Sequence, residues 1–232
     1  MQMLVSNLSK AFDQKIVLDN ITMNFEKGKI YALVGRNGCG KTTFFNCIAK
    51  EISADLGSVT FDDGTLVEAK DVGYVYANPM LPEFLTGNEF LKFFLEVHKE
   101  RGFVSSDVDA YFDSIQFDRL DRDKLIKNYS HGMRNKLQML CVTILKPKVL
   151  LLDEPLTSFD LVASIEMKQQ LRDLREGCIT ILSTHILQIA REICDELVVL
   201  HKGEMRQIDN LNLQDPNIEG ELLEILKDQH ES

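Results

Sequence analysis

The chain has 232 residues, and its 26 basic and 36 acidic side chains leave a formal net charge of −10. This balance excludes a protein that holds nucleic acid through many Lys and Arg contacts to phosphates, but it allows one local anion site. With 44% hydrophobic and 27% charged residues, the composition excludes a disordered chain. No apolar run approaches about 18 residues, so no membrane span is expected.

The N-terminal segment and the cysteines point to the same compartment. Residues 1–7 lack the basic region and the apolar stretch of a signal peptide. The five cysteines are odd in number, widely spaced and without a C-x-x-C pair, which argues against a zinc knuckle or a redox pair. Several of them lie among apolar residues, as in reduced proteins. We therefore expect a cytoplasmic protein.

The first third of the chain predicts short strands separated by turns. A loosely alternating pattern over 17–25 and a compact apolar run over 30–34 predict two strands on either side of a turn at Gly28. A glycine-rich loop follows, and a helix is predicted over 42–50. Further short strands are predicted over 58–61 and 72–75.

The middle of the chain predicts helices. Thr86 and Glu89 form a capping-box pattern, and apolar residues then recur at helical spacing up to Val97. A second helix is predicted over 108–115. Seven of the 13 phenylalanines fall between Phe84 and Phe117. We expect a helical subdomain over about 79–146, with most of these rings inside and one or two at a docking surface.

From residue 130 onward an α/β pattern returns. Apolar residues line one face of a helix that ends before Pro147, and four apolar residues over 149–152 predict a strand buried on both faces. Helices are predicted over 161–175, 187–194 and 219–228, and strands over 179–182, 197–200 and 204–208. Since no repeat or linker interrupts the pattern, we expect one domain over 1–232.

The loop from Gly35 to Thr42 matches the pattern G-x-x-x-x-G-K-S/T. In such a loop, backbone N–H groups surround phosphate oxygens at the N-terminus of a helix, the lysine reaches the β- and γ-phosphates, and the hydroxyl binds Mg²⁺. The alternative is a structural glycine-rich turn, but the strand before and the helix after the loop favour a nucleotide site. The candidate nucleotide-binding residues are Gly35, Asn37, Gly38, Cys39, Gly40, Lys41, Thr42 and Thr43.

Two acidic residues follow the strand predicted over 149–152. A buried strand can place a carboxylate near the metal bound to the phosphates, so Asp153 is the second candidate metal ligand beside Thr42. Glu154 is a candidate general base that polarises the attacking water. Because many strands end in acidic residues, Asp153 and Glu154 indicate a nucleotide site only in combination with the phosphate loop.

Together these motifs resemble those of the ATP-binding subunit of an ABC transporter, over nearly the whole chain. Tyr129-Ser-His-Gly-Met133 stands where that family has its LSGGQ signature. The resemblance implies an α/β fold with a P-loop NTPase core and a mostly parallel sheet. It also implies an N-terminal antiparallel β subdomain and an inserted helical subdomain.

The resemblance assigns roles to further residues. It implies that Ser130 and Gly132 contact the γ-phosphate of ATP bound to the opposite subunit, whereas the alternative for Ser130 is a helix cap. His185 matches the switch histidine, next to Glu154 and the γ-phosphate, so Lys41, Glu154 and His185 form the implied catalytic set. Asp160 matches a residue that crosses the dimer interface, and it can equally cap the helix that begins at residue 161.

Three positions call for comment. Phe12 stands where the family stacks an aromatic ring on adenine, although a core position is the alternative. Ala77 occupies the place of a glutamine that touches Mg²⁺ and the attacking water, and Asn78, one residue on, points to the opposite face of an extended segment. We therefore expect slower hydrolysis, or an Mg²⁺ shell completed by water. Cys39 either fills a tight loop or responds to oxidants, and His131 replaces a signature glycine in a tolerated variant.

The resemblance implies an ATP-hydrolysing motor subunit that uses ATP and Mg²⁺. It would form a homodimer or a heterodimer around two ATP molecules and drive a membrane subunit encoded separately, from the cytoplasmic face of the membrane. The signature resembles that of bacterial exporter-type systems, and no nucleic acid is expected as a partner. The alternatives are a soluble ABC-type ATPase acting on ribosomes or DNA, and a nucleotide-dependent regulator with weak hydrolysis.

Overall fold

The computed structural model describes residues 1–101, 103, 107–155, 161–208 and 220. Its strands are β1 (Gln2–Phe12), β2 (Lys15–Glu26), β3 (Ile30–Val34), β4 (Leu56–Phe61), β5 (Val72–Val75), β6 (Val149–Asp153), β7 (Ile179–Thr184), β8 (Glu196–His201) and β9 (Glu204–Ile208). Its α-helices are α1 (Lys41–Ile48), α2 (Gly87–Val97), α3 (Val108–Ser114), α4 (Arg119–Arg122), α5 (His131–Leu145), α6 (Leu161–Leu174) and α7 (Leu187–Ile193). The helix predicted over 219–228 lies, apart from Gly220, outside these residues.

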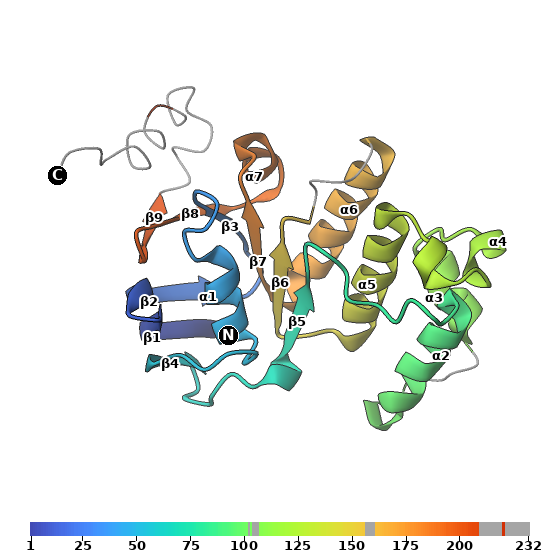
Figure 1. Cartoon of the computed structure of the whole chain (residues 1–232), viewed down its shortest axis with the longest axis horizontal. Helices are drawn as coiled ribbons and strands as arrows, with labels where there is room; N and C mark the ends of the chain where they lie inside the picture. Colours follow the sequence, from blue (N-terminus) through green and yellow to red (C-terminus); the bar gives the residue numbers. More distant parts are fainter. Residues whose placement is uncertain (102, 104–106, 156–160, 209–219, 221–232) are drawn as a thin grey trace.

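Two sheets organise the molecule (Figure 1). A small sheet has the strand order β2-β1-β4, and both of its pairs are antiparallel. The large sheet has the order β5-β6-β7-β3-β8-β9, in which every pair is parallel except β8 with β9. The predicted fold class, with a mostly parallel sheet and an antiparallel N-terminal sheet, is confirmed.

The phosphate-loop helix α1 lies between the two sheets. Phe44, Phe45 and Ile48 of α1 are completely buried and share one apolar cluster with residues of both sheets. β3 and β6 are buried along their whole length, as expected of parallel strands covered on both faces. The start of α1 and the ends of these two strands are therefore held by the main core.

The hairpin between β1 and β2 extends further than the sequence pattern predicts. The strand expected over 17–25 begins at Lys15, and the turn consists of Asp13 and Gln14 with φ angles of 45° and 69°. Positive φ at both central residues is typical of two-residue hairpin turns, which usually contain glycine. Because neither Asp13 nor Gln14 is a glycine, the sequence does not indicate this turn, although the backbone adopts it.

The segment between β5 and β6 is helical, and α5 lies between α2–α4 and the large sheet (Figure 1). One face of α5 packs with α2 and α3, whereas Met139 and Val142 join a cluster with β5, β6 and α6. The predicted capping box of α2 is present, since Thr86 Oγ1 accepts from Glu89 N at 3.1 Å and Glu89 Oε2 accepts from Thr86 N at 2.8 Å. The boundaries of a helical subdomain at 79–146 stay a prediction.

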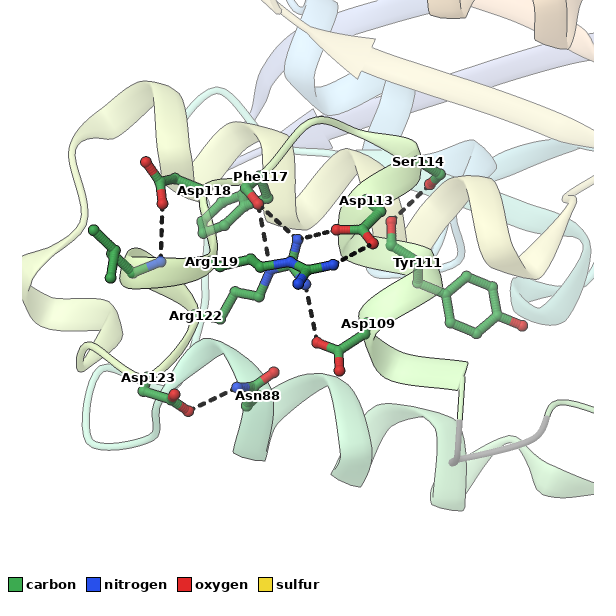
Figure 2. Close-up of polar contacts among 11 residues, drawn as sticks. Asn88, Asp109, Tyr111, Asp113, Ser114, Phe117, Asp118, Arg119, Arg122 and Asp123 are labelled. Carbon is green, nitrogen blue, oxygen red and sulfur yellow. Dashed lines mark hydrogen bonds and ion pairs between the residues drawn. The ribbon is translucent and has the colours of Figure 1, made fainter.

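A buried arginine joins α3 to α4 (Figure 2). Arg122 is 2% exposed, and its guanidinium donates to Asp113, to Asp109 Oδ1 at 2.9 Å and to the carbonyl oxygen of Phe117 at 2.9 Å. A buried charge is tolerated when it is paired and hydrogen-bonded in this way. These contacts order α4, a helix of four residues that hydrophobic spacing does not predict.

Candidate nucleotide site

The glycine-rich loop connects the end of β3 to the start of α1. Gly40, the last residue before the helix, has a φ of 112°, and a Cβ placed on it would lie 3.0 Å from Val17 Cγ1. A residue with a side chain rarely adopts this φ angle, so glycine is required here. The loop thus brings backbone N–H groups to the N-terminus of α1, where an anion is stabilised.

Lys41 is the first residue of α1 and is only 7% exposed. Its ammonium donates to the carbonyl oxygen of Gly35 at 2.8 Å and to that of Arg36 at 3.4 Å. The side chain therefore folds back along the loop that begins the motif. A cation in this position can donate to phosphate oxygens held by the same loop.

Asp153 is oriented by two hydroxyl groups. Thr42 Oγ1 donates to Asp153 Oδ2 at 2.8 Å, and Ser183 Oγ donates to Asp153 Oδ1 at 2.6 Å. Asp153 and Ser183 face each other in the register of β6 and β7. The carboxylate at the end of β6 is therefore fixed next to the first turn of α1.

Glu154 adopts a backbone conformation that is uncommon for a residue with a side chain. Its φ is 49°, and its N–H donates to Ser183 Oγ at 2.9 Å. Its carboxylate Oε2 lies 2.9 Å from Nδ1 of His185. Left-handed residues of this kind persist only where their surroundings hold them, and they cluster at functional sites. The predicted pairing of Glu154 with His185 is thus present in the geometry.

A cavity of about 370 Å³ opens between the phosphate loop and the end of β6. It is large enough for a small-molecule ligand. Eight of the predicted site residues meet in it, together with Val17 and Ala77. The predicted residues that line it are Asn37, Gly38, Gly40, Lys41, Thr42, Thr43, Asp153 and Glu154.

The oxygen atoms at this cavity suit a magnesium ion that also binds phosphates. Mg²⁺ prefers oxygen ligands and is usually held by one or two carboxylates together with substrate phosphates. The Thr42 hydroxyl and the Asp153 carboxylate, whose oxygens are 2.8 Å apart, provide two oxygen ligands of this kind beside the phosphate loop. Within the described ranges, no three His, Cys, Asp or Glu side chains gather to hold a metal by themselves.

Several predicted site residues lie outside the cavity lining. Ser130 caps α5, since its Oγ accepts from Met133 N at 3.2 Å, and Gly132 lies in the first turn of that helix. Phe12 ends β1 and is 46% exposed, which contradicts the alternative that it belongs to the core. Asp160 lies outside the described residues. Gly35 packs closely against the backbone of Leu200. A Cβ placed on Gly35 would lie 2.5 Å from the Leu200 carbonyl oxygen, which leaves no room for a side chain.

Cys39 packs partly buried against the main core beside Gly35. Burial raises the pKa of the Cys39 thiol above its ordinary value, although the nearby Lys41 opposes this rise. A raised pKa lowers the fraction of reactive thiolate. The geometry therefore favours the interpretation that Cys39 fills a tight loop.

Sequence reasoning missed two residues of this site. Ser183 bridges Asp153 and the Glu154 N–H, and Val17 comes from β2 to line the cavity next to Gly40. For Ser183 a signal exists, because it lies two residues before His185, at the end of the strand beside β6. For Val17 no local signal exists, since its place depends on how β2 packs on the loop.

Comparison with known proteins identifies the family. The model of the ABC transporter family matches residues 18–157. The chain is also 31% identical to the ABC transporter ATP-binding protein YdbJ of Bacillus subtilis, over 95% of this chain and 73% of that protein. The chain belongs to the ABC transporter family. It is an ATP-binding ATPase subunit of this kind, as the motifs predict.

Two further matches agree with this placement in the ABC transporter family. The sulfate/thiosulfate import ATP-binding protein CysA 1 of Chromobacterium violaceum is 32% identical over 90% of this chain, which spans 61% of that relative's length. A solved structure of the ATP-binding subunit of an ABC transporter has a TM-score of 0.85 and 23% identity, with 98% of this chain and 100% of the other covered. That likeness supports the ABC ATPase fold.

Proposed function

We propose that this ABC subunit is the motor of a transporter, in which hydrolysis of ATP at the cavity between the phosphate loop and β6 drives a separate membrane subunit. The observation that carries the proposal is the meeting of Lys41, Thr42, Asp153 and Glu154 at one cavity. These four side chains provide a cation, two oxygen ligands and a base. Phosphoryl transfer depends on this combination of charge stabilisation and positioning.

Each of these residues has a defined task in hydrolysis. Lys41 donates to phosphate oxygens, while Thr42 and Asp153 would hold Mg²⁺. When bound, Mg²⁺ would neutralise the negative charge that develops on the phosphate oxygens. Glu154 accepts a proton from the attacking water, and His185 holds the Glu154 carboxylate by the contact of 2.9 Å.

A second copy of the subunit, or a related one, would complete the site. Ser130 and Gly132 lie at the start of α5 and do not line the cavity of their own chain. The first N–H groups of a helix have no intrahelical partner, so the N-terminus of a helix such as α5 suits an anion. We infer that Ser130 and Gly132 contact the γ-phosphate of ATP bound to the other subunit. Asp160 is assigned to the same interface, and Phe12 to stacking on adenine.

The membrane partner would dock next to α2. No helix among the described residues is long and apolar enough to cross a membrane. Of the seven phenylalanines between Phe84 and Phe117, Phe84 and Phe93 are exposed by 78% and 61%, and Met80, which precedes Phe84 in the chain, is 74% exposed. This apolar surface suits a membrane-embedded subunit, which would place the chain on the cytoplasmic face of the membrane.

The direction of transport stays a prediction. The signature at 129–133 resembles that of exporter-type members, whereas the relative CysA 1 of Chromobacterium violaceum is named an import protein. The second candidate function, a regulator that binds ATP and hydrolyses it weakly, is favoured by one observation. Ala77 lines the cavity at the place where the family has a glutamine, and it brings no polar group.

Co-purification and turnover test this proposal together. We expect a tagged chain to retain a protein with about six membrane-spanning segments from detergent-solubilised membranes. We also expect the purified complex to release phosphate from ATP in a Mg²⁺-dependent manner. ATP binding without phosphate release by that complex would support the regulator instead. Recovery of ribosomal proteins or DNA in place of a membrane protein would contradict the motor function.

Replacing Ala77 with glutamine should raise the hydrolysis rate. The position lines the same cavity as Asp153 and Glu154, so a side-chain amide there reaches the hydrolytic water. One additional well-placed hydrogen bond corresponds to a gain in kcat of about 3- to 10-fold. Phosphate release under saturating ATP measures the effect, and Asn78→Gln at the adjacent exposed position is the control. An unchanged kcat for Ala77→Gln would show that this loop is not deficient.

A further inference from the structure

Gln138 is a buried polar side chain on α5 for which the functions above give no role. It is 6% exposed and lies about two turns after the Ser130 cap of the same helix. A buried side-chain amide needs partners for both its donor and its acceptor. Its partners are backbone groups of one residue: Nε2 donates to the Tyr76 carbonyl oxygen at 3.1 Å, and Oε1 accepts from the Tyr76 N–H at 3.3 Å.

This pair of hydrogen bonds acts at the wall of the nucleotide cavity. The Tyr76 carbonyl belongs to the peptide bond that joins Tyr76 to Ala77, and Ala77 lines the cavity together with Lys41 and Glu154. The ladder between β5 and β6 ends at the pair of Val75 with Leu152. The amide of Gln138 therefore binds the backbone directly beyond the last residue that the sheet itself holds.

The side chain of Tyr76 is held from the opposite direction. Its phenol donates to Glu51 just after the phosphate-loop helix α1, and its ring stacks on Tyr74 with centroids 4.2 Å apart. Burial raises the pKa of Tyr76, so the phenol remains a protonated donor at neutral pH. Tyr76 is thus fixed to the segment after α1 through its side chain and to α5 through its backbone.

We propose that Gln138 is a positioning residue for ATP hydrolysis, which holds the peptide between Tyr76 and Ala77 at the cavity wall. Because α5 begins at the signature, Gln138 links that helix to the nucleotide site of the same chain. This inference rests on the proposed motor function. It assigns to the Gln138 amide the connection between the helix that begins at the signature and the wall of the nucleotide cavity.

Two substitutions test the role of Gln138. Gln138→Met keeps the approximate length of the side chain but removes both hydrogen bonds, and we expect kcat to fall about 10- to 100-fold because the cavity wall shifts. The phosphate loop is intact, so KM for ATP should change by no more than about twofold. Gln138→Glu keeps the acceptor for the Tyr76 N–H and loses the donor to its carbonyl, so its kcat should be intermediate.

Thr143→Val is the matched control on the same helix. Thr143 Oγ1 donates to the Met139 carbonyl oxygen at 2.9 Å within α5 and does not line the nucleotide cavity, so its kcat should equal that of the wild type. Wild-type kcat in Gln138→Met, or a rise in KM at unchanged kcat, would overturn the inference. If Gln138→Met does not fold, wild-type kcat in Gln138→Glu overturns it instead.

The same assay separates the inference from the proposal on which it rests. A wild-type complex without turnover overturns both the motor function and the role of Gln138. A wild-type complex that turns over, together with variants that keep its kcat, overturns only the role of Gln138. A fall in kcat at constant KM in both variants, smaller for Gln138→Glu than for Gln138→Met, supports the role of Gln138.

Discussion

Replacing Glu154 with glutamine will leave ATP binding intact and lower kcat for hydrolysis by about 100-fold or more, the contribution expected of a general base. The amide has the shape of the carboxylate but cannot accept a proton from water. The backbone at this position is held independently of the side chain, through the N–H of Glu154 and Ser183 Oγ at 2.9 Å. The substitution therefore removes the base and preserves the cavity.

Steady-state phosphate release and size-exclusion chromatography with ATP measure the two consequences. We expect the Glu154→Gln variant to elute as a dimer when Mg²⁺ and ATP are present, because bound ATP is no longer consumed between the two subunits. Glu176→Gln, an exposed position in the turn after α6, is the control for the loss of one negative charge. A Glu154→Gln variant that retains a third or more of the wild-type kcat would show that another group acts as the base.

The phosphate loop could be predicted from the sequence because its geometry is local. Gly40 needs a positive φ, Lys41 and Thr42 begin the helix, and β3 ends directly before the loop. Asp153 could be predicted for a related reason, since the ends of parallel strands lie at one edge of a sheet. In both cases neighbouring residues in the chain specify the conformation that brings the functional groups to the cavity.

The remaining contacts of the site depend on packing between distant segments. Ser183 reaches Asp153 only because β6 and β7 pair in the register that places these two residues opposite each other. Val17 reaches the loop only because β2 packs beside Gly40. Gln138 and Tyr76 are separated by 62 residues, and neither residue type suggests the other. Periodicity and motif spacing contain no information on such pairs.

The helices between β5 and β6 also differ in whether local sequence or tertiary contacts specify them. α2 was predictable because its capping box lies within four residues, whereas α4 depends on the contacts that Arg122 makes with Asp109 and Asp113 of α3. Of the seven clustered phenylalanines that were expected mostly inside, Phe112 and Phe117 are buried and three more pack partly buried against the same cluster, whereas Phe84 and Phe93 are exposed. Composition thus predicted the core of this segment but not the helix that closes it.

Replacing Lys41 with alanine will weaken ATP binding itself. The ammonium lies in the loop that surrounds the phosphates, 2.8 Å from the Gly35 carbonyl oxygen, and its exposed fraction of 7% keeps bulk water from substituting for it. A hydrogen bond to a charged group contributes up to about 3 kcal/mol, so the Kd for ATP should rise about 100-fold. Turnover at subsaturating ATP should fall by at least the same factor.

Isothermal titration with a non-hydrolysable ATP analogue measures this effect directly. Lys92→Ala on the exposed face of α2 is the control for the loss of one positive charge and should keep the wild-type Kd. The two substitutions change different quantities, because Lys41→Ala raises the Kd for ATP and Glu154→Gln lowers kcat at constant Kd. A folded Lys41→Ala variant with the Kd of the wild type would mean that the cavity does not hold the phosphates, and the assignment of Asp153 and Glu154 beside it would lose its basis.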